Sequence, residues 1–470
     1  MKLNKDRIEE FEKYLVEKME KEDIPGISIA IAHKEDVLYS EGFGYRNKEM
    51  KKGMTPNTIL GVASVSKSFA SLAIAQLIEQ EKISYEDSLT KFFPDFNLPG
   101  EYDPSDIKVK HLLNHTAGFP PMESLGYSIV NNTEADPEED RSRFTKDYTV
   151  DSIEEFVDFL SNVAEYEMLG KPGEYISYSN DSYGLLGGII EKITGITFAD
   201  YVKENIFNPL DMNRSLFDAS ELKKFDDVTT LYYKKDGEVK TSNNWQEAPP
   251  FDAVGWIKTT ANDLIKYAQM YANGGELKNK RLLSEKSLSD MLDTDVDYKS
   301  YNKYACGLNV QENYNGLTLV SHGGSFKGVS SHFGFIPETN LAVVVLCNRT
   351  GVSVGDIWLS AVNAALSLPL ETKRREYRNQ KEDIRQYLDF EGKYASEEGA
   401  EIEIEARLFV KYKNEEEAEI KIVEPNLGII KFGETILEMP FYRDEKGKAW
   451  AIGAASRIIR KLEDGSDLKR

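Results

Sequence analysis

Hydrophobic residues recur with two different periods along the chain. Residues 26–45, GISIAIAHKEDVLYSEGFGY, predict two strands joined by a polar turn, and residues 71–79, SLAIAQLIE, predict a mostly buried helix. Residues 317–348 form strand-like runs separated by glycine- and proline-containing turns, which indicates an antiparallel meander. The first part of the chain is therefore predicted to have strands at both ends and helices between them.

A second unit follows a charged stretch. The sequence ETKRREYRNQKEDIRQ, residues 371–386, has almost no apolar residues and is typical of a linker. Beyond it, apolar residues alternate with mainly charged ones, as in EIEIEARLFVKY (residues 401–412), which is the period of half-buried strands. We therefore expect a large domain over residues 1–370, a linker, and a small antiparallel β-barrel or sandwich over residues 387–470.

Composition and charge narrow the class of partners. The 470-residue chain is 40% hydrophobic and has a formal net charge of −22, which suits packed domains and disfavours nucleic acid and anionic membranes as partners. No run is long and apolar enough to span a bilayer, and residues 1–23 lack the apolar core of a signal peptide. We expect a cytoplasmic protein, unless an export signal has been trimmed. Cys306 and Cys347 predict buried thiols in a reducing compartment.

A serine and a lysine stand one helical turn apart in GVASVSKSF, residues 61–69. Because residues i and i+3 share a helix face, Ser64 Oγ and Lys67 Nζ can come within hydrogen-bonding distance. A desolvated lysine has a lowered pKa, so its neutral amine can take the proton of a serine hydroxyl. The same spacing also fits a helix N-cap followed by a solvent-exposed lysine, and the S-x-x-K pattern occurs five more times in the chain.

Two further motifs follow in chain order. Tyr178-Ser-Asn180 supplies a phenol and an amide before a predicted helix, and His322-Gly-Gly324 lies where glycines allow a substrate backbone to come close. The three motifs in this order resemble those of the serine β-lactamase and penicillin-binding-protein superfamily. Their surroundings, such as KHLLNHTAGFP, resemble its class C-like branch of esterases, D-aminopeptidases and related peptidases. The resemblance covers about residues 5–368.

The resemblance implies a fold and a set of roles. The fold would be an α/β domain with an antiparallel sheet flanked by helices, beside an all-helical subdomain, with the active site between them. Ser64 would be the nucleophile and Lys67 its activating neighbour, and Tyr178 would pass a proton to the leaving group. The backbone N–H groups of Ser64 and Ser325 would form the oxyanion hole. The residues that it assigns to substrate binding are Asn180, His322, Gly323, Gly324 and Ser325.

One motif departs from the family pattern. Many β-lactamases and penicillin-binding proteins have Lys-Thr-Gly where this chain has His-Gly-Gly. Because a neutral or partly charged histidine anchors a carboxylate less well than an ammonium, we expect little β-lactam hydrolysis. The departure favours D-amino-terminal peptides, amides or simple esters as substrates. The C-terminal unit also resembles, at the level of the fold alone, the barrel domains that some D-aminopeptidases carry.

The sequence thus predicts a serine hydrolase that forms an acyl-enzyme on small peptides, amides or esters, with a D-aminopeptidase-like peptidase as the first interpretation. A carboxylesterase and a β-lactamase or DD-peptidase are the alternatives within the enzyme class. A catalytically inactive peptide-binding protein is the alternative outside it. The partner would be a small-molecule or peptide substrate. We expect no cofactor and no metal, because no histidine is paired with a cysteine at ligand spacing. The sequence makes no prediction of oligomeric state.

Overall fold

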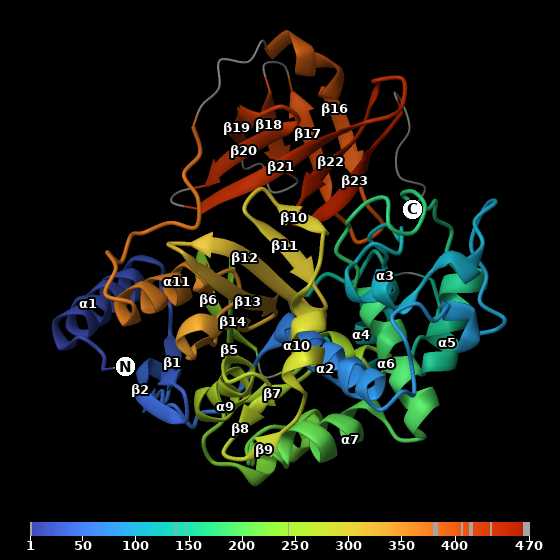
Figure 1. The fold of residues 1–470 in the computed structure, drawn as a ribbon. Helices are drawn as coiled ribbons and strands as arrows, with labels where there is room; N and C mark the ends of the chain where they lie inside the picture. The colour runs from blue at the N-terminus through green and yellow to red at the C-terminus, as the bar shows by residue number, and fades with distance from the viewer. Residues whose placement is uncertain are drawn as a thin grey trace.

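The computed structural model describes residues 2–463, apart from residues 137–138, 145, 243, 379–383, 406–407, 413–416 and 433–434. Parts of the predicted linker and of the predicted C-terminal domain therefore lie outside the described residues. Figure 1 shows a larger body, in which helices surround a sheet, and a barrel that lies above one end of it.

The larger body is organised around a nine-stranded antiparallel sheet with the strand order β10-β11-β12-β13-β14-β15-β1-β2-β3. The first strand of the chain, β1, pairs with β15, so distant parts of the sequence meet at the centre of the sheet. The predicted meander is the run of neighbours from β13 to β15. The strands are β1 (Gly26–His33), β2 (Asp36–Asn47), β3 (Lys52–Gly53), β10 (Asp297–Lys299), β11 (Asn302–Ala305), β12 (Leu308–Tyr314), β13 (Leu317–Phe326), β14 (Val329–Ile336) and β15 (Leu341–Cys347).

Both faces of the central strands are buried. On β1, Ile29 and Ile31 belong to the core formed with α1 (Lys5–Lys21) and α11 (Val354–Ala365), whereas Ala30 and Ala32 belong to the core on the other face. Successive side chains of a strand point to opposite faces, so one strand contributes to two cores. The second core includes residues of α9 (Ala261–Ala272), which packs against β1, β14 and β15.

The helical region lies beside the sheet and is centred on α2 (Ser66–Glu79). Residues 66–77 of this helix are all buried, as expected for a helix that is apolar around most of its surface. It packs against α6 (Asn180–Thr194) and α8 (Asp252–Gly255), while the turn before it contacts β13 and β14. The other helices are α3 (Val109–Leu113), α4 (Ser124–Asn132), α5 (Ile153–Asp158), α7 (Phe198–Val202) and α10 (Glu285–Leu292). Three two-stranded ribbons complete this body: β4 (Leu60–Gly61) with β7 (Lys258–Thr259), β5 (Leu231–Lys235) with β6 (Glu238–Ser242), and β8 (Glu276–Leu277) with β9 (Lys280–Arg281).

The C-terminal body is a closed barrel of eight antiparallel strands. Alternate residues such as Ile402 and Ile404 point into its core, which confirms the predicted period of two. The strands are β16 (Gly392–Ala395), β17 (Glu401–Glu405), β18 (Phe409–Tyr412), β19 (Glu417–Glu424), β20 (Leu427–Phe432), β21 (Thr435–Arg443), β22 (Ala449–Ala454) and β23 (Arg457–Lys461). The predicted fold class is thereby confirmed, and the domain boundaries stay a prediction.

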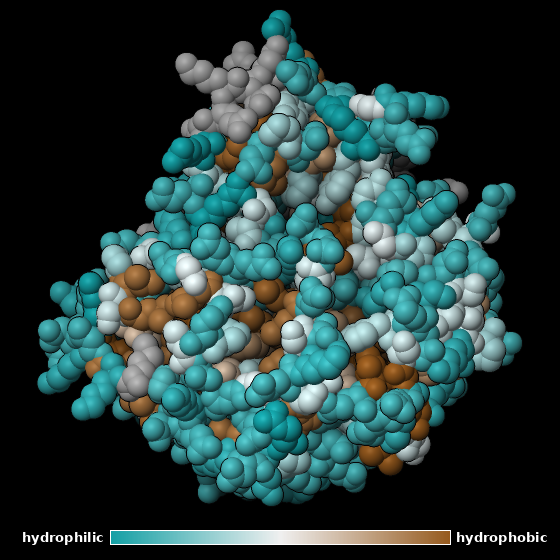
Figure 2. Space-filling view, viewed as in Figure 1, coloured by the Kyte–Doolittle hydropathy of each residue, from teal (hydrophilic) through white to brown (hydrophobic). Residues whose placement is uncertain are grey.

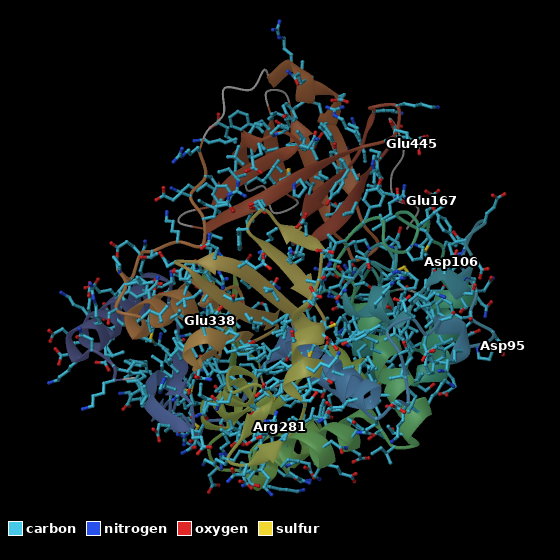
Figure 3. All side chains as sticks on the ribbon, in the orientation of Figure 1. Asp95, Asp106, Glu167, Arg281, Glu338 and Glu445 are labelled. Atoms are coloured by element: carbon cyan, nitrogen blue, oxygen red, sulfur yellow. The ribbon has the colours of Figure 1, made fainter. Side chains whose placement is uncertain are left out.

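The surface is mainly hydrophilic on the face shown in Figure 2. Many acidic side chains point outward, among them the exposed Asp95, Glu167 and Glu445 that are labelled at the rim in Figure 3. Among the described residues, no helix has both the length and the apolar character that a membrane span requires.

Candidate active site

Ser64 lies in a short 3-10 turn (Ala63–Val65) that leads directly into α2. It is the one residue of the segment 61–70 that is not fully buried. The preceding residue, Ala63, adopts a left-handed φ of 48°, an uncommon conformation for a residue with a side chain. Such local strain is frequent at functional sites, where it presents a side chain to a cleft.

Lys67 is completely buried below Ser64. Its Nζ lies 3.3 Å from Ser64 Oγ, 3.0 Å from Asn180 Oδ1 and 3.2 Å from the carbonyl oxygen of Val254. Burial holds the pKa of Lys67 well below its ordinary value, and the positive charge of Arg457 lowers it further. The geometry therefore favours an uncharged amine beside the serine hydroxyl.

Tyr178 completes this group. Its ring centroid lies 4.8 Å from Lys67 Nζ, and its hydroxyl hydrogen-bonds with Ser64. Burial raises the pKa of Tyr178 above its ordinary value, and the hydrogen bond with Ser64 partly offsets this effect. The structure thus brings together the three side chains that the sequence analysis singled out as catalytic.

A chain of hydrogen bonds runs behind Tyr178. The backbone N–H of Ser179 donates to His115 Nδ1 (3.1 Å), so the proton of a neutral His115 is on Nε2, which lies 3.1 Å from the Tyr304 hydroxyl. At the other end, His322 Nδ1 lies 2.6 Å from the carbonyl of Gly323, which can only accept. His322 Nε2 is therefore free to accept from the Tyr304 hydroxyl at 3.1 Å. The two histidines carry their protons on different nitrogens.

His115 and His322, the two histidines of this hydrogen-bonded series, are both uncharged. Burial holds the pKa of His115 well below its ordinary value and lowers the pKa of His322 to about 3. His322 thus lies at the site as the resemblance implied, but as a neutral hydrogen-bonding group that supplies no positive charge to the cleft.

Asn180 lies between the amine of Lys67 and the carboxylate of Glu398. Its Oδ1 accepts from Lys67, and its Nδ2 donates to Glu398 Oε1 at 3.2 Å. In this arrangement Asn180 orients the amine of Lys67. Its role in substrate binding, which the resemblance implied, stays a prediction.

The glycines of β13 allow the strand to approach the nucleophile. A Cβ atom on Gly324 would lie 2.2 Å from the carbonyl oxygen of Val62 and 2.9 Å from the backbone nitrogen of Ser64. Gly323 and Gly324 are partly exposed and Ser325 is exposed, so this edge faces the cleft. The proximity is what an oxyanion hole built from Ser64 and Ser325 requires.

Two charged residues from the barrel also reach the site. Arg457 Cζ lies 5.2 Å from the ring centroid of Tyr178, and its guanidinium forms an ion pair with Glu398, with a second contact of 3.1 Å between Nη2 and Oε1. Glu398 in turn accepts from Asn180. The sequence analysis did not find these two residues, because they belong to a different domain and to no recognisable motif.

The β22–β23 turn places Arg457 in the cleft. The backbone N–H of Tyr178 donates to the carbonyl of Ser456 (3.0 Å), and the backbone N–H of Ile458 donates to Ser177 Oγ (3.2 Å). Ala455 and Ser456 have φ values of 47° and 69°, which tight hairpin turns require and which are uncommon for these residue types. Glycine or asparagine at these two positions would have indicated such a turn in the sequence. Because alanine and serine occupy them, nothing in the sequence indicated the turn.

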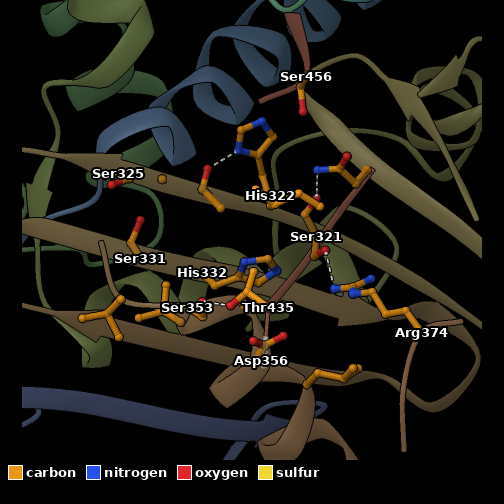
Figure 4. A pocket seen from close by; sticks show the side chains of 18 of the residues that line it. Ser321, His322, Ser325, Ser331, His332, Ser353, Asp356, Arg374, Thr435 and Ser456 are labelled. Carbon is orange, nitrogen blue, oxygen red and sulfur yellow. Dashed lines mark hydrogen bonds between the residues drawn. The ribbon is translucent and has the colours of Figure 1, made fainter. Parts of the chain in front are cut away.

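These residues line one cavity of about 1180 Å³. The lining includes Ser64, Tyr178, Asn180 and Arg457. The β13 edge also lines the cavity, and Figure 4 labels His322 and Ser325 on it. Among the described residues, no group of three or more histidine, cysteine or acidic side chains could hold a metal ion. Cys306 and Cys347 are buried and free, and burial raises the pKa of each thiol to about 12.

A family model described as "Beta-lactamase" matches residues 11–365. The chain is 26% identical over 353 residues to "Protein flp" of Staphylococcus aureus (strain MW2), covering 74% of this chain and 64% of that protein. It is also 26% identical over 341 residues to "Penicillin-binding protein 4*" of Bacillus subtilis (strain 168), covering 70% and 69%. The chain thus spans less than two thirds of the length of the first of these relatives.

One solved structure is similar over nearly the whole chain. It is described as the "octameric penicillin-binding protein homologue from Pyrococcus abyssi", with 28% sequence identity and a TM-score of 0.67. The match covers 96% of this chain and 100% of that chain, so it includes the barrel as well as the larger body.

Proposed function

Since the chain belongs to the β-lactamase family, we propose that it is a serine hydrolase that works through an acyl-enzyme formed on Ser64. The observation that carries this proposal is the meeting of three side chains: the buried amine of Lys67 lies 3.3 Å from Ser64 Oγ, and the Tyr178 hydroxyl hydrogen-bonds with Ser64. A nucleophile beside a base whose pKa is lowered is the arrangement that acyl transfer needs.

The proton balance of this amine suits the reaction. An uncharged amine has two N–H donors and one lone pair, so Lys67 can donate to Asn180 and Val254 and accept the hydroxyl proton of Ser64. Ser64 Oγ then attacks the carbonyl carbon, and the tetrahedral oxyanion is held by the backbone N–H groups of Ser64 and Ser325. Tyr178 passes its proton to the leaving amine or alcohol and regains one from Lys67, so the Ser64 proton ends on the leaving group. In the second step Lys67 and Tyr178 take a proton from water, which attacks the acyl-enzyme, and return it to Ser64 Oγ as the acid leaves.

The substrates are small peptides, amides or esters, with a D-aminopeptidase-like peptidase as the finer proposal. Barrel residues bound the cleft beside Tyr178 and Asn180, which supports short substrates. A neutral His322 supports the expectation that penicillin-like carboxylates are not bound on β13. Relative rates with D-Ala-p-nitroanilide, L-Ala-p-nitroanilide, p-nitrophenyl butyrate and nitrocefin separate this activity from a carboxylesterase and from a β-lactamase.

Covalent labelling tests the nucleophile directly. We expect a fluorophosphonate to add one adduct, seen as intact mass, and Ser64→Ala to abolish both the adduct and turnover. The free energy of unfolding should stay within about 1 kcal/mol of the parent value, because Ser64 is partly exposed and fills no core. Ser220→Ala is the matched control, since Ser220 has the same spacing to Lys223 but is exposed on the surface.

The labelling result also distinguishes a serine hydrolase from a catalytically inactive peptide-binding protein. If no adduct forms even with a large excess of the probe, the result favours the inactive peptide-binding protein over the serine hydrolase. A Ser64→Ala variant that turns over substrate at the parent rate would show that another residue is the nucleophile.

A further inference from the structure

We propose that His115 is a positioning residue for the reaction: its carbonyl oxygen and its ring nitrogen Nδ1 together hold the backbone on both sides of Tyr178. The phenol of Tyr178 is thereby kept at Ser64 and at the leaving group. This inference rests on the proposed function, in which Tyr178 passes a proton to the leaving group, and it adds a residue that belongs to none of the three motifs.

The segment that carries Tyr178 is bound from two sides. The backbone N–H of Ser177 donates to the carbonyl oxygen of His115 (3.0 Å), and the backbone N–H of Ser179 donates to His115 Nδ1 (3.1 Å). The N–H of Tyr178, which lies between them, donates to the carbonyl of Ser456 on the barrel (3.0 Å). Buried backbone N–H groups need a partner, and His115 supplies two of these three. One residue therefore holds both chain neighbours of the catalytic tyrosine.

The ring of His115 also packs against Tyr178. The two ring centroids lie 4.3 Å apart, and the ring planes are tilted by 41°. His115 is 1% exposed and is not among the described residues that line the cavity. A residue at this place cannot touch the substrate, so any effect that it has on the reaction passes through Tyr178.

His115 is itself held in a defined orientation. Its φ of 58° is left-handed, a conformation in which histidine and asparagine are enriched among the residues that carry a side chain. Its ring is enclosed by Tyr178, Tyr183 and Tyr304, whose centroids lie 4.3, 5.1 and 4.8 Å away. Nε2 donates to the Tyr304 hydroxyl at 3.1 Å. The ring therefore cannot turn without breaking contacts on both of its nitrogens.

The two ring nitrogens have separate tasks. Nδ1 must accept the N–H of Ser179, which a neutral imidazole does only when its proton is on Nε2. Nε2 reaches the hydroxyl of Tyr304, on the far side of the ring from Ser179. The side-chain amide of asparagine can occupy the position of Nδ1, and that of the longer glutamine the position of Nε2. The two amides thus separate the contact that holds the Tyr178 segment from the contact with Tyr304.

Displacement of the Tyr178 phenol is expected to affect some leaving groups more than others. A 4-nitrophenolate departs without a proton, whereas the more basic phenolate benefits from one supplied by Tyr178. General acid catalysis contributes about 10²- to 10⁴-fold to such steps, and it is lost when the acid is out of hydrogen-bonding reach. The leaving-group dependence of the rate therefore reports the position of the phenol, which a change in folding stability alone would not alter.

The test measures kcat/KM for 4-nitrophenyl butyrate and for phenyl butyrate and takes the ratio of the two values. We expect His115→Gln to raise this ratio on the order of 10-fold, because the acceptor for Ser179 is lost and the phenol moves away from the leaving group. His115→Asn should restore most of the parent ratio, because its amide oxygen can accept from Ser179 and asparagine tolerates a left-handed φ. Thermal unfolding shows that each variant is folded.

A double variant and a matched control locate the effect. Tyr178→Phe should raise the ratio by itself, and adding His115→Gln to it should raise the ratio no further, because the two changes act on one proton transfer. His111→Gln is the control. His111 Nδ1 also accepts a backbone N–H, that of Lys108 at 3.1 Å, but His111 is not among the described residues that line the cavity. Its replacement should leave the ratio unchanged.

The same comparison can be made by labelling if neither ester is hydrolysed. The 4-nitrophenyl and phenyl esters of one phosphonate then replace the two butyrates, and the ratio of their labelling rates is measured. Should His115→Gln not fold, His115→Asn still decides: a ratio raised above that of the parent would refute the role of Nδ1, and an unchanged ratio supports it.

The outcomes separate this inference from the proposed function. If the parent protein is labelled by the fluorophosphonate but His115→Gln leaves the ratio unchanged, His115 does not position Tyr178 and the serine hydrolase stands. The same conclusion follows if His115→Asn raises the ratio as much as His115→Gln, or if His115→Gln raises it further in the Tyr178→Phe background. If the parent protein is not labelled at all, the proposed function is refuted, and the role of His115 with it.

Discussion

Replacing Arg457 by methionine should raise the pKa of Lys67 and weaken the protein's reactivity in acid. Lys67 Nζ and Arg457 Cζ lie 4.8 Å and 5.2 Å from the same ring centroid of Tyr178, so the two charges are no more than about 10 Å apart. With an effective dielectric constant of about 20, two unit charges at this distance repel each other by about 1.7 kcal/mol. Because the cavity is open to solvent, roughly 1 to 2 kcal/mol is expected, which corresponds to a change in rate on the order of 5- to 30-fold.

The rate of fluorophosphonate labelling between about pH 5 and pH 10 measures this effect without knowledge of the natural substrate. Removing the cation should move the acid limb of the profile to higher pH, because a larger fraction of Lys67 is then protonated at a given pH. Glu398→Gln should move it to lower pH, because the Glu398 carboxylate raises the pKa of Lys67. Arg460→Met is the control, since Arg460 lies on the same strand but donates to the carbonyl of Met168, outside the cavity.

The two variants, Arg457→Met and Glu398→Gln, are expected to shift the acid limb of the pH profile in opposite directions. If both single variants shift the profile in the same direction, or neither shifts it, the barrel does not set the protonation of Lys67. A double variant, Arg457→Met with Glu398→Gln, should lie between the two single variants.

Three further predictions concern the site. In ¹⁵N NMR spectra of the five histidines, His115 should be protonated at Nε2 and His322 at Nδ1, and Tyr304→Phe should leave both tautomers unchanged because backbone groups fix them; identical tautomers in the parent protein would refute the hydrogen-bond chain. Lys67→Met should abolish labelling yet leave the free energy of urea unfolding equal or higher, because an apolar chain of similar length replaces a buried amine; a large loss of stability would contradict this. Gly324→Ala should cost about 1 to 3 kcal/mol in the same urea assay and reduce labelling, because its Cβ would overlap backbone atoms of the nucleophile turn; unchanged values of both would refute the close approach.

The barrel is more than an appended domain in this arrangement. Its Glu398 and Arg457 lie within the contact network of Lys67, Asn180 and Tyr178. The charge of the site therefore depends on how the barrel is docked, and changes at the barrel interface are expected to alter the pH dependence of the reaction.

The amino-acid sequence by itself determined the secondary structure and the family. The period of two in β17 and the apolar run of α2 are local signals, because strand and helix geometry fix which neighbours share a face. The order of the Ser64, Tyr178 and His322 motifs indicated the family, which the comparison over residues 11–365 confirmed. The same motifs named the catalytic candidates, whose roles stay a proposal.

Only the tertiary structure decided the charges of the site. His322 and Lys67 are ordinary titratable residues in the sequence, and their low pKa values follow from burial, which depends on the packing of segments far apart in the chain. Arg457 carries no local signature of function, since it lies on a strand whose alternation reports only which side chains face a core. Its place in the cleft follows from the docking of the barrel, and neither a motif nor a period encodes such long-range contacts.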